Sequence, residues 1–205
     1  MTQSQLLKRV LKPSIFLLSL LPAGLLAYHG LTNQLSANPI SDITLETGVW
    51  TLRFLCITLC VTPLRKLTGW NQIGPLRKMI GLFAFFYGTL HFTTYIWLDQ
   101  FFDLHSILKD IAKRPFILVG FSSFVLLVPL AITSFNALMK KMGGKRWKGL
   151  HRLVYATAIG GVIHYYWLVK ADIRRPIIYG IIVAILLAYR LWDYFSKKIS
   201  SRPLS

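Results

Sequence analysis

Six long apolar runs constrain the fold of this chain more than any other feature of its sequence. Each run is close to the roughly 20 residues that a helix needs to cross a hydrocarbon core. The runs do not alternate with a period of two, and within lipid only helices or closed barrels satisfy their own backbone groups. We therefore expect an all-α integral membrane protein, a bundle of six transmembrane helices that forms a single domain over residues 1–205. The expected spans are 14–30, 49–64, 79–97, 116–135, 150–169 and 177–194.

The net charge of +17 does not indicate nucleic-acid binding, because its distribution along the chain follows the expected topology. With the N-terminus in the cytoplasm, the inner side holds 17 of the 24 basic residues and only one of the seven acidic residues, Asp193. These basic residues lie in the segments 8–12, 65–78, 140–152 and 190–202. Cytoplasmic loops carry an excess of Lys and Arg. Both termini are therefore predicted to be cytoplasmic, with the basic groups near anionic lipid head groups.

Three smaller features complete the organisation. The first apolar run follows a basic start, as in a signal peptide, but it lacks a small-x-small cleavage site, so we expect a retained span. The outer segment 98–115 mixes apolar and charged residues and predicts a short interfacial helix. Cys56 and Cys60 lie in the second run, where apolar cysteines are usually inert filler. No Cys-x-x-Cys-His motif occurs, which excludes covalently attached c-type haem.

Three histidines, His91, His151 and His164, lie within the apolar runs. An ionisable group in hydrocarbon is costly and marks a functional site by default, and histidine is an axial ligand of haem. His91 follows Lys78 by 13 residues, and His164 precedes Lys170 by six, as His91 precedes Trp97. These spacings put His91 and His164 at one height in the outer half, with His151 about 20 Å deeper. We predict that His91 and His164 clamp one haem b between facing helices.

His151 requires a separate interpretation, because it is directed about 140° away from His164 on an ideal helix and cannot share its haem. The position opposite His151 on the third helix is near Arg77. A second, inner haem would then have one protein ligand or a different second ligand. Alternatively, His151, Arg77, Lys78 and Arg152 bind an anionic group such as haem propionates or a flavin phosphate.

Arg53 and three glycines are weaker candidates. Arg53 lies about one turn inside the second run, where it either snorkels to the outer surface or pairs with an outer haem propionate. Gly88 precedes His91 by one turn, and Gly160 and Gly161 precede His164 by one turn. These glycines either let a flat macrocycle approach the backbone or let helices pack closely.

Two motifs resemble the ferric-reductase-like transmembrane family. The first is Leu-Arg-Lys-Met-Ile-Gly-Leu over 76–82, followed by Phe86-Tyr87 and His91. The second is Trp-Lys-Gly-Leu-His-Arg-Leu-Val-Tyr over 147–155, with His164 thirteen residues after its histidine, a step that resembles the NADPH oxidases. The resemblance covers the whole chain. Within the family, the chain is similar to the haem-binding membrane subunits of periplasmic methionine-sulfoxide reductase systems in Gram-negative bacteria.

The resemblance implies one or two b-type haems and FMN, with His91, His151 and His164 as haem ligands. It implies a subunit of the bacterial inner membrane that delivers electrons to a periplasmic molybdopterin enzyme, which reduces methionine sulfoxide in damaged proteins. The electrons would come from the quinone pool or from a cytosolic flavin reductase. The oxidases carry a fourth histidine where this chain has Arg77, so the second ligand of an inner haem stays open. No motif for FMN can be matched residue by residue.

Two other functions remain in view. The chain has no Gly-x-Gly-x-x-Gly fingerprint, so it needs an electron donor, and its short outer loops favour a separate acceptor protein. A transporter that relays protons through histidines is the first alternative, although the second to sixth spans contain no interior Asp or Glu. The second alternative is a ferric or other metal reductase that acts on a small outer substrate.

Overall fold

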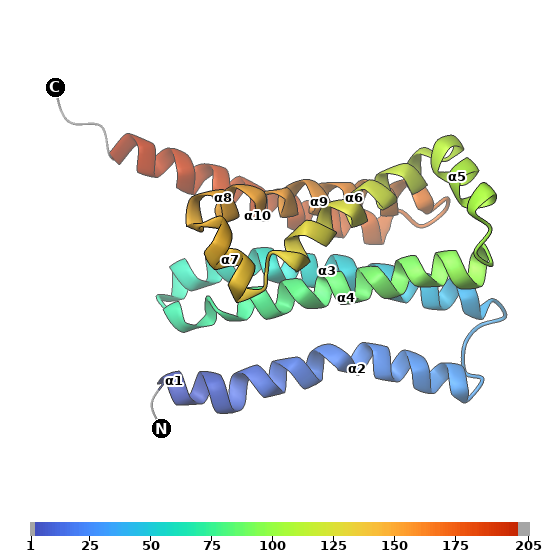
Figure 1. Cartoon of the computed structure of the whole chain (residues 1–205), viewed down its shortest axis with the longest axis horizontal. Helices are drawn as coiled ribbons and strands as arrows, with labels where there is room; N and C mark the ends of the chain where they lie inside the picture. The colour runs from blue at the N-terminus through green and yellow to red at the C-terminus, as the bar shows by residue number, and fades with distance from the viewer. Residues whose placement is uncertain (1–2, 201–205) are drawn as a thin grey trace.

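The computed structural model describes residues 3–200, and every regular element within them is a helix. The elements are α1 (Gln3–Leu6), η1 (Leu7–Leu11), α2 (Lys12–Leu31), α3 (Pro39–Thr68), η2 (Asn71–Ile73), α4 (Leu76–Thr94), η3 (Tyr95–Asp99), α5 (Leu104–Lys113), α6 (Pro115–Ile132), α7 (Asn136–Met142), α8 (Gly144–Leu150), α9 (Leu153–Leu168) and α10 (Arg174–Ser200). Figure 1 shows α3 and α4 between α2 on one side and α6, α9 and α10 on the other. The all-α prediction is confirmed for these residues. Arg202, one of the basic residues assigned to the cytoplasm, lies outside them.

Within residues 3–200, five helical segments are long and apolar enough to cross a membrane, and each overlaps a predicted span. They are Leu7–Leu31, Pro39–Thr68, Asn71–Asp99, Pro115–Ile132 and Arg174–Ile199. The remaining expected span, 150–169, corresponds to α9, which has 16 residues and is therefore about 24 Å long. It is shorter than predicted because the chain turns at 151–152 and becomes extended at Val169. Even so, α9 packs within the bundle against α6 and α10.

The ends of α3 follow from the residues at its termini. The side-chain oxygen of Asn38 accepts a hydrogen bond from the Ser41 N–H at 3.1 Å, and Pro39 occupies the first helical position. At the other end, Gly69 adopts a φ of +69°, a left-handed conformation that glycine reaches without steric strain. These two ends leave a 30-residue helix that contacts α2, α4, α9 and α10 and forms the centre of the bundle.

Aromatic packing between α3 and α4 forms the main core. Phe54 stacks on Phe83 at 5.6 Å and on Tyr87 at 5.2 Å between ring centroids. All three side chains are buried, together with Leu55 and Ala84. Offset stacking of this kind adds to the apolar burial of the rings. The α3–α4 pair therefore gives the bundle a rigid centre against which the other helices are positioned.

The hydroxyl of Tyr87 is inserted into the hydrogen-bond ladder of α2. It donates to the Ser19 carbonyl at 2.8 Å and accepts from the Ala23 N–H at 3.1 Å. These two backbone groups are four residues apart and would otherwise bond each other. The opening lies beside Pro22, whose ring already disrupts the ladder at this turn. One buried phenol thus joins α4 to a helix whose outer surface is otherwise largely exposed.

Arg190 joins α10 to α3 by a related device. Its guanidinium donates to the Leu186 carbonyl at 2.7 Å and also to the Leu59 carbonyl. Leu59 would normally accept from the residue four positions later, but that residue is Pro63, which has no N–H. Arg190 therefore satisfies a carbonyl that the proline leaves without its helical partner.

The segment after α4 contains the short amphipathic helix α5 (Leu104–Lys113), in the place where the sequence predicted a short helix. The Asp103 carboxylate caps it by accepting from the backbone N–H groups of His105 and Ser106, at 3.0 and 3.3 Å. Hydrogen bonds from Ser106 hold the pKa of the Asp103 carboxyl below its usual range. Ile107 is buried, whereas Leu104 is largely exposed. The helix therefore has an apolar side chain that no other part of the described chain covers.

Candidate functional site

The structure brings together two of the three predicted histidine ligands. His91 lies near the end of α4 and His164 near the end of α9, with ring centroids 6.0 Å apart and planes inclined at 77°. One metal ion held between two imidazoles needs two bonds of about 2 Å, plus roughly 1 Å from each nitrogen to its ring centre, a total of roughly 6 Å. The observed spacing therefore fits a single metal ion bound by both rings.

Backbone carbonyls determine the protonation of both rings. The Nδ1 of His91 lies 2.8 Å from the Thr44 carbonyl oxygen of α3, and that of His164 lies 2.7 Å from the Phe116 carbonyl oxygen of α6. A carbonyl only accepts, so each Nδ1 donates, and in a neutral imidazole each Nε2 then keeps its lone pair. Metal-binding histidines use this arrangement, with the second ring nitrogen bonded to a carbonyl or carboxylate.

Two glycines form the walls against which the rings lie. A Cβ atom at Gly48 would lie 3.0 Å from the Nδ1 of His91, and one at Gly120 would lie 2.6 Å from the Nδ1 of His164. The sequence interpretation missed both glycines, as well as the carbonyls of Thr44 and Phe116. An interior glycine destabilises a helix by about 1 kcal/mol relative to alanine, so its presence is a signal. The glycines singled out from the sequence lie on the helices that carry the histidines, whereas Gly48 and Gly120 lie on the facing helices.

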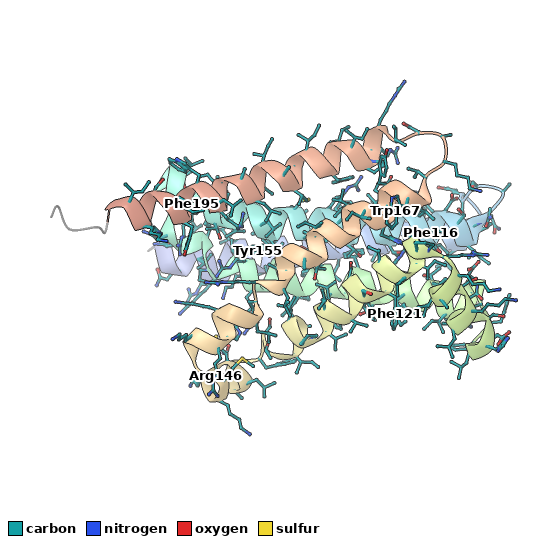
Figure 2. The ribbon with its side chains drawn as sticks, turned by 90° about the horizontal axis from the view of Figure 1, so that it is seen from above. Phe116, Phe121, Arg146, Tyr155, Trp167 and Phe195 are labelled. Atoms are coloured by element: carbon teal, nitrogen blue, oxygen red, sulfur yellow. The ribbon has the colours of Figure 1, made fainter. Side chains whose placement is uncertain are left out.

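His151 lies apart from this pair, in the turn between α8 and α9. Its ring stacks on Trp147 at 4.0 Å, and its Nε2 lies 3.1 Å from the Thr133 hydroxyl. That hydroxyl donates to the Pro129 carbonyl at 2.6 Å, so it accepts from His151, and Nδ1 is the ring nitrogen with the lone pair. Figure 2 shows Phe116 and Trp167 at one end of the bundle and Arg146 of α8 near the other. His151 therefore belongs to the end opposite the histidine pair.

Comparison with known proteins supports the family resemblance of the two histidine-containing motifs, 76–91 and 147–164. A family model described as the ferric-reductase-like transmembrane component matches residues 47–162, a stretch that includes His91 and His151. A protein-methionine-sulfoxide reductase heme-binding subunit MsrQ from Herminiimonas arsenicoxydans is 55% identical over 198 residues, which cover 96% of this chain and 91% of the relative. The chain belongs to the MsrQ family. The MsrQ of Rhodospirillum rubrum is 45% identical over 208 residues, with both proteins covered completely.

The family assignment makes this MsrQ-family chain a multi-pass membrane protein. The MsrQ of Azospira oryzae supports the same assignment at 56% identity over 183 residues, which cover 88% of this chain and 78% of the relative. No solved structure matches the chain. The geometry of the histidine pair therefore comes from this structure alone.

The basic residues predicted around His151 do not converge on one point. The Arg77 guanidinium donates to the Thr62 hydroxyl at 3.2 Å. The Lys78 amine donates a hydrogen bond to the Asn136 side-chain oxygen of α7 at 2.7 Å. Arg152 is exposed in the turn before α9. The part of these residues in a site around His151 therefore stays a prediction.

Arg53 and the glycines of the histidine-bearing helices take part in helix packing. Arg53 donates from Nε to the Tyr179 hydroxyl at 3.0 Å, and its guanidinium lies 4.4 Å from the centre of the Trp50 ring. A Cβ at Gly160 would collide with the Ser123 hydroxyl of α6, and one at Gly161 would lie 3.5 Å from Leu52 of α3. For these glycines, close helix packing is therefore the better of the two interpretations.

Proposed function

We propose that this MsrQ-family chain is the haem b-binding, electron-transferring membrane subunit of a protein-methionine-sulfoxide reductase system. The observation that carries the proposal is the His91–His164 pair, whose rings are 6.0 Å apart and whose Nδ1 atoms are both engaged by backbone carbonyls. The relatives from Herminiimonas and Rhodospirillum are named heme-binding subunits. Among the described residues, no group of three or more His, Cys, Asp or Glu gathers as a metal site, so two axial imidazoles suit a macrocycle that supplies the other ligands.

In this proposal, His91 of α4 and His164 of α9 would hold the haem. A haem held there supplies one-electron redox chemistry. The Nε2 atoms of His91 and His164 would hold it, and the carbonyls of Thr44 and Phe116 would fix the orientation of the two rings. Because protein nitrogens would fill both axial positions, the site would leave no coordination position for a substrate. Such a site favours electron transfer over binding and activation of a small molecule.

The proposed topology has six crossings, with α9 as a short fifth span and with both termini in the cytoplasm. It is supported by the 17 basic residues on the inner side and by the shared end at which α2 begins and α10 finishes in Figure 1. A short span is accommodated by local thinning of the bilayer. The histidine pair would then lie toward the periplasm, on the side of the proposed acceptor, the molybdopterin catalytic subunit MsrP, in a bacterial inner membrane.

We further propose that electrons enter near His151 at the cytoplasmic end, from the quinone pool or from a cytosolic flavin reductase. His151 would bind a second haem or, with Arg77 and Arg152, an anionic group. Arg53 remains a candidate partner for an outer haem propionate. FMN belongs to the proposal through the family resemblance, and we assign it no site among the described residues.

Visible spectra of the purified protein test the proposal. The dithionite-reduced wild-type protein should show the sharp α-band of low-spin haem b. His91→Ala and His164→Ala should each abolish that signal, because either change leaves one axial ligand in an apolar site. His29→Ala and His105→Ala serve as controls and should keep the band. A wild-type protein without the band, or His91→Ala and His164→Ala proteins that retain it, would contradict the proposal.

A further inference from the structure

We propose that Gly48 and Gly120 are positioning residues for the two histidines, because the missing side chain lets each imidazole reach a carbonyl inside a neighbouring helix. The consequence for a bound haem rests on the proposed function, whereas the contact between glycine and imidazole does not. Neither glycine lies on a helix that carries one of the histidines.

The same arrangement occurs twice. His91 donates a hydrogen bond to the Thr44 carbonyl in α3, and Gly48 lies four residues after Thr44. His164 bonds the carbonyl of Phe116 in α6, and Gly120 again stands four residues after it. In both places the ring lies against the glycine, and a Cβ there would meet Nδ1 at 3.0 Å or 2.6 Å. The α3–α4 and α6–α9 pairs therefore position their histidines with the same local geometry.

Helix geometry explains why the residue four positions after the carbonyl matters. Side chains on a helix tilt toward its N-terminus, so the side chain at that position lies beside the carbonyl. Elsewhere in these helices a hydroxyl occupies this place: Thr47 donates to the Ile43 carbonyl at 2.6 Å, and Ser123 donates to the Val119 carbonyl at 2.8 Å. At Gly48 and Gly120 the imidazole from the neighbouring helix takes the position that a local side chain would otherwise fill.

Gly88 and Gly161 have more room than Gly48 and Gly120, and no imidazole lies against them. A Cβ at Gly88 would lie 3.6 Å from its nearest neighbours, and one at Gly161 would lie 3.5 Å from Leu52, both ordinary van der Waals distances. Gly161 is on α9, close to His164 in sequence. It therefore provides a matched control for the effect of adding a methyl group near the site.

Fixing the two rings has two consequences for a bound haem. The bond from Nδ1 to a carbonyl makes Nε2 a stronger donor, which stabilises ferric over ferrous iron and lowers the reduction potential. The glycine walls also hold the planes at 77°. Ferric low-spin haem with nearly perpendicular imidazole planes gives an electron paramagnetic resonance signal with a larger maximum g value than haem with parallel planes.

The first experiment compares Gly48→Ala, Gly120→Ala and the control Gly161→Ala in the haem-loaded, detergent-purified protein. We expect a large maximum g value for wild type and Gly161→Ala. Gly48→Ala should lower that g value and raise the midpoint potential, since its Cβ meets the ring at the longer distance. Gly120→Ala should reduce haem occupancy by roughly tenfold or more. If both variants match Gly161→Ala in spectrum, potential and occupancy, the proposal is wrong.

The second experiment guards against a simple folding defect. If the added methyl group acts through the imidazole, then removing the imidazole removes the effect. Gly120→Ala should lower the melting temperature by about 4 °C or more in the presence of His164 and should not lower it in a His164→Ala background, where the higher helix propensity of alanine acts alone. The Gly48 and His91 pair should behave in the same way. Equal losses with and without the ring would overturn the proposal.

The two experiments also separate this proposal from the proposed function. A wild-type protein without low-spin haem would overturn the proposed function and the haem consequences together, while the melting temperatures would still decide the contact. Normal haem in the wild type, with glycine variants that behave like Gly161→Ala, would overturn the positioning proposal alone.

Discussion

Four residues around the histidine pair fix the two imidazole rings, two through a backbone carbonyl and two through the absence of a side chain. The carbonyls of Thr44 and Phe116 select the ring nitrogen that donates, and Gly48 and Gly120 leave room for the ring. His151 differs because its Nε2 is engaged by the Thr133 hydroxyl rather than by a backbone carbonyl. In His91 and His164, a backbone carbonyl thus engages Nδ1 and leaves the Nε2 lone pair available. In His151, a hydroxyl engages Nε2 instead.

We predict that His151→Ala leaves the outer haem spectroscopically present but slows its reduction by the physiological donor. His151 lies at the end of the bundle opposite the pair, about 20 Å from it along the helices. Stopped-flow reduction with the donor and with dithionite measures the two rates, and dithionite should still reduce the haem. Loss of all haem would mean that His151 helps hold a shared site, and a normal rate with the donor would remove it from the electron path.

At the scale of whole helices, a side chain from a neighbouring helix bonds the backbone close to each of two prolines. Pro63 deprives the Leu59 carbonyl of its helical donor, and Arg190 of α10 supplies another. Beside Pro22, the ladder of α2 accommodates the Tyr87 hydroxyl. Interruptions that would weaken an isolated helix therefore become its points of attachment to neighbouring helices.

We predict that Arg190→Ala destabilises the protein by about 1.5–3 kcal/mol, the usual contribution of a hydrogen bond from a charged donor. The Leu59 carbonyl would lose its donor inside the bundle. Unfolding in detergent by chemical denaturant measures the loss. Pro63→Ala restores a backbone N–H to that carbonyl, so Arg190→Ala should cost less in the Pro63→Ala background. An equal cost in both backgrounds would show that Arg190 does not act through this carbonyl.

The start of α5 should respond to pH through Asp103. Hydrogen bonds from Ser106 lower the pKa of Asp103 in the folded protein, so the cap stabilises α5 above the unfolded pKa and is lost as pH falls. We expect the backbone amides of His105 and Ser106 to lose protection from hydrogen exchange, relative to the intrinsic rate at each pH, below about pH 4. Asp103→Asn keeps a capping oxygen without a carboxyl, and its exchange should lack this extra pH dependence. Identical pH profiles for both proteins would contradict the prediction.

At the scale of the whole molecule, charge and helix order determine which end faces the cytoplasm. We predict that a reporter fused to the C-terminus is active as a cytosolic reporter and silent as a periplasmic one, because 17 of 24 basic residues lie in the terminal and loop segments that the proposed topology assigns to the inner side. A fusion in the loop between α2 and α3 should give the opposite pattern. A reversed result would place the histidine pair toward the cytoplasm and overturn the proposed electron path.

The sequence predicts those properties that depend on distance along the chain. The common height of His91 and His164 follows from the rise per residue and the basic and aromatic residues at the helix ends. The partners of the two rings could not be predicted in this way, because Thr44 and Phe116 are selected by the rotation and crossing of neighbouring helices. The length of α9 was overestimated because the apolar run continues through a turn that hydropathy does not detect.

The attachment of α2 at Tyr87 has a consequence for the order of assembly in the cell. Ser19 and Ala23 are synthesised more than 60 residues before the phenol that separates them. A ribosome that delivers the chain from its N-terminus therefore releases α2 well before its partner exists, and the backbone of α2 must meanwhile satisfy itself within lipid. Before α4 is present, the Ala23 N–H is therefore expected to bond the Ser19 carbonyl within α2. The backbone of α2 can adopt its final hydrogen bonding only after α4 has packed against it, because the Tyr87 hydroxyl supplies both bonds.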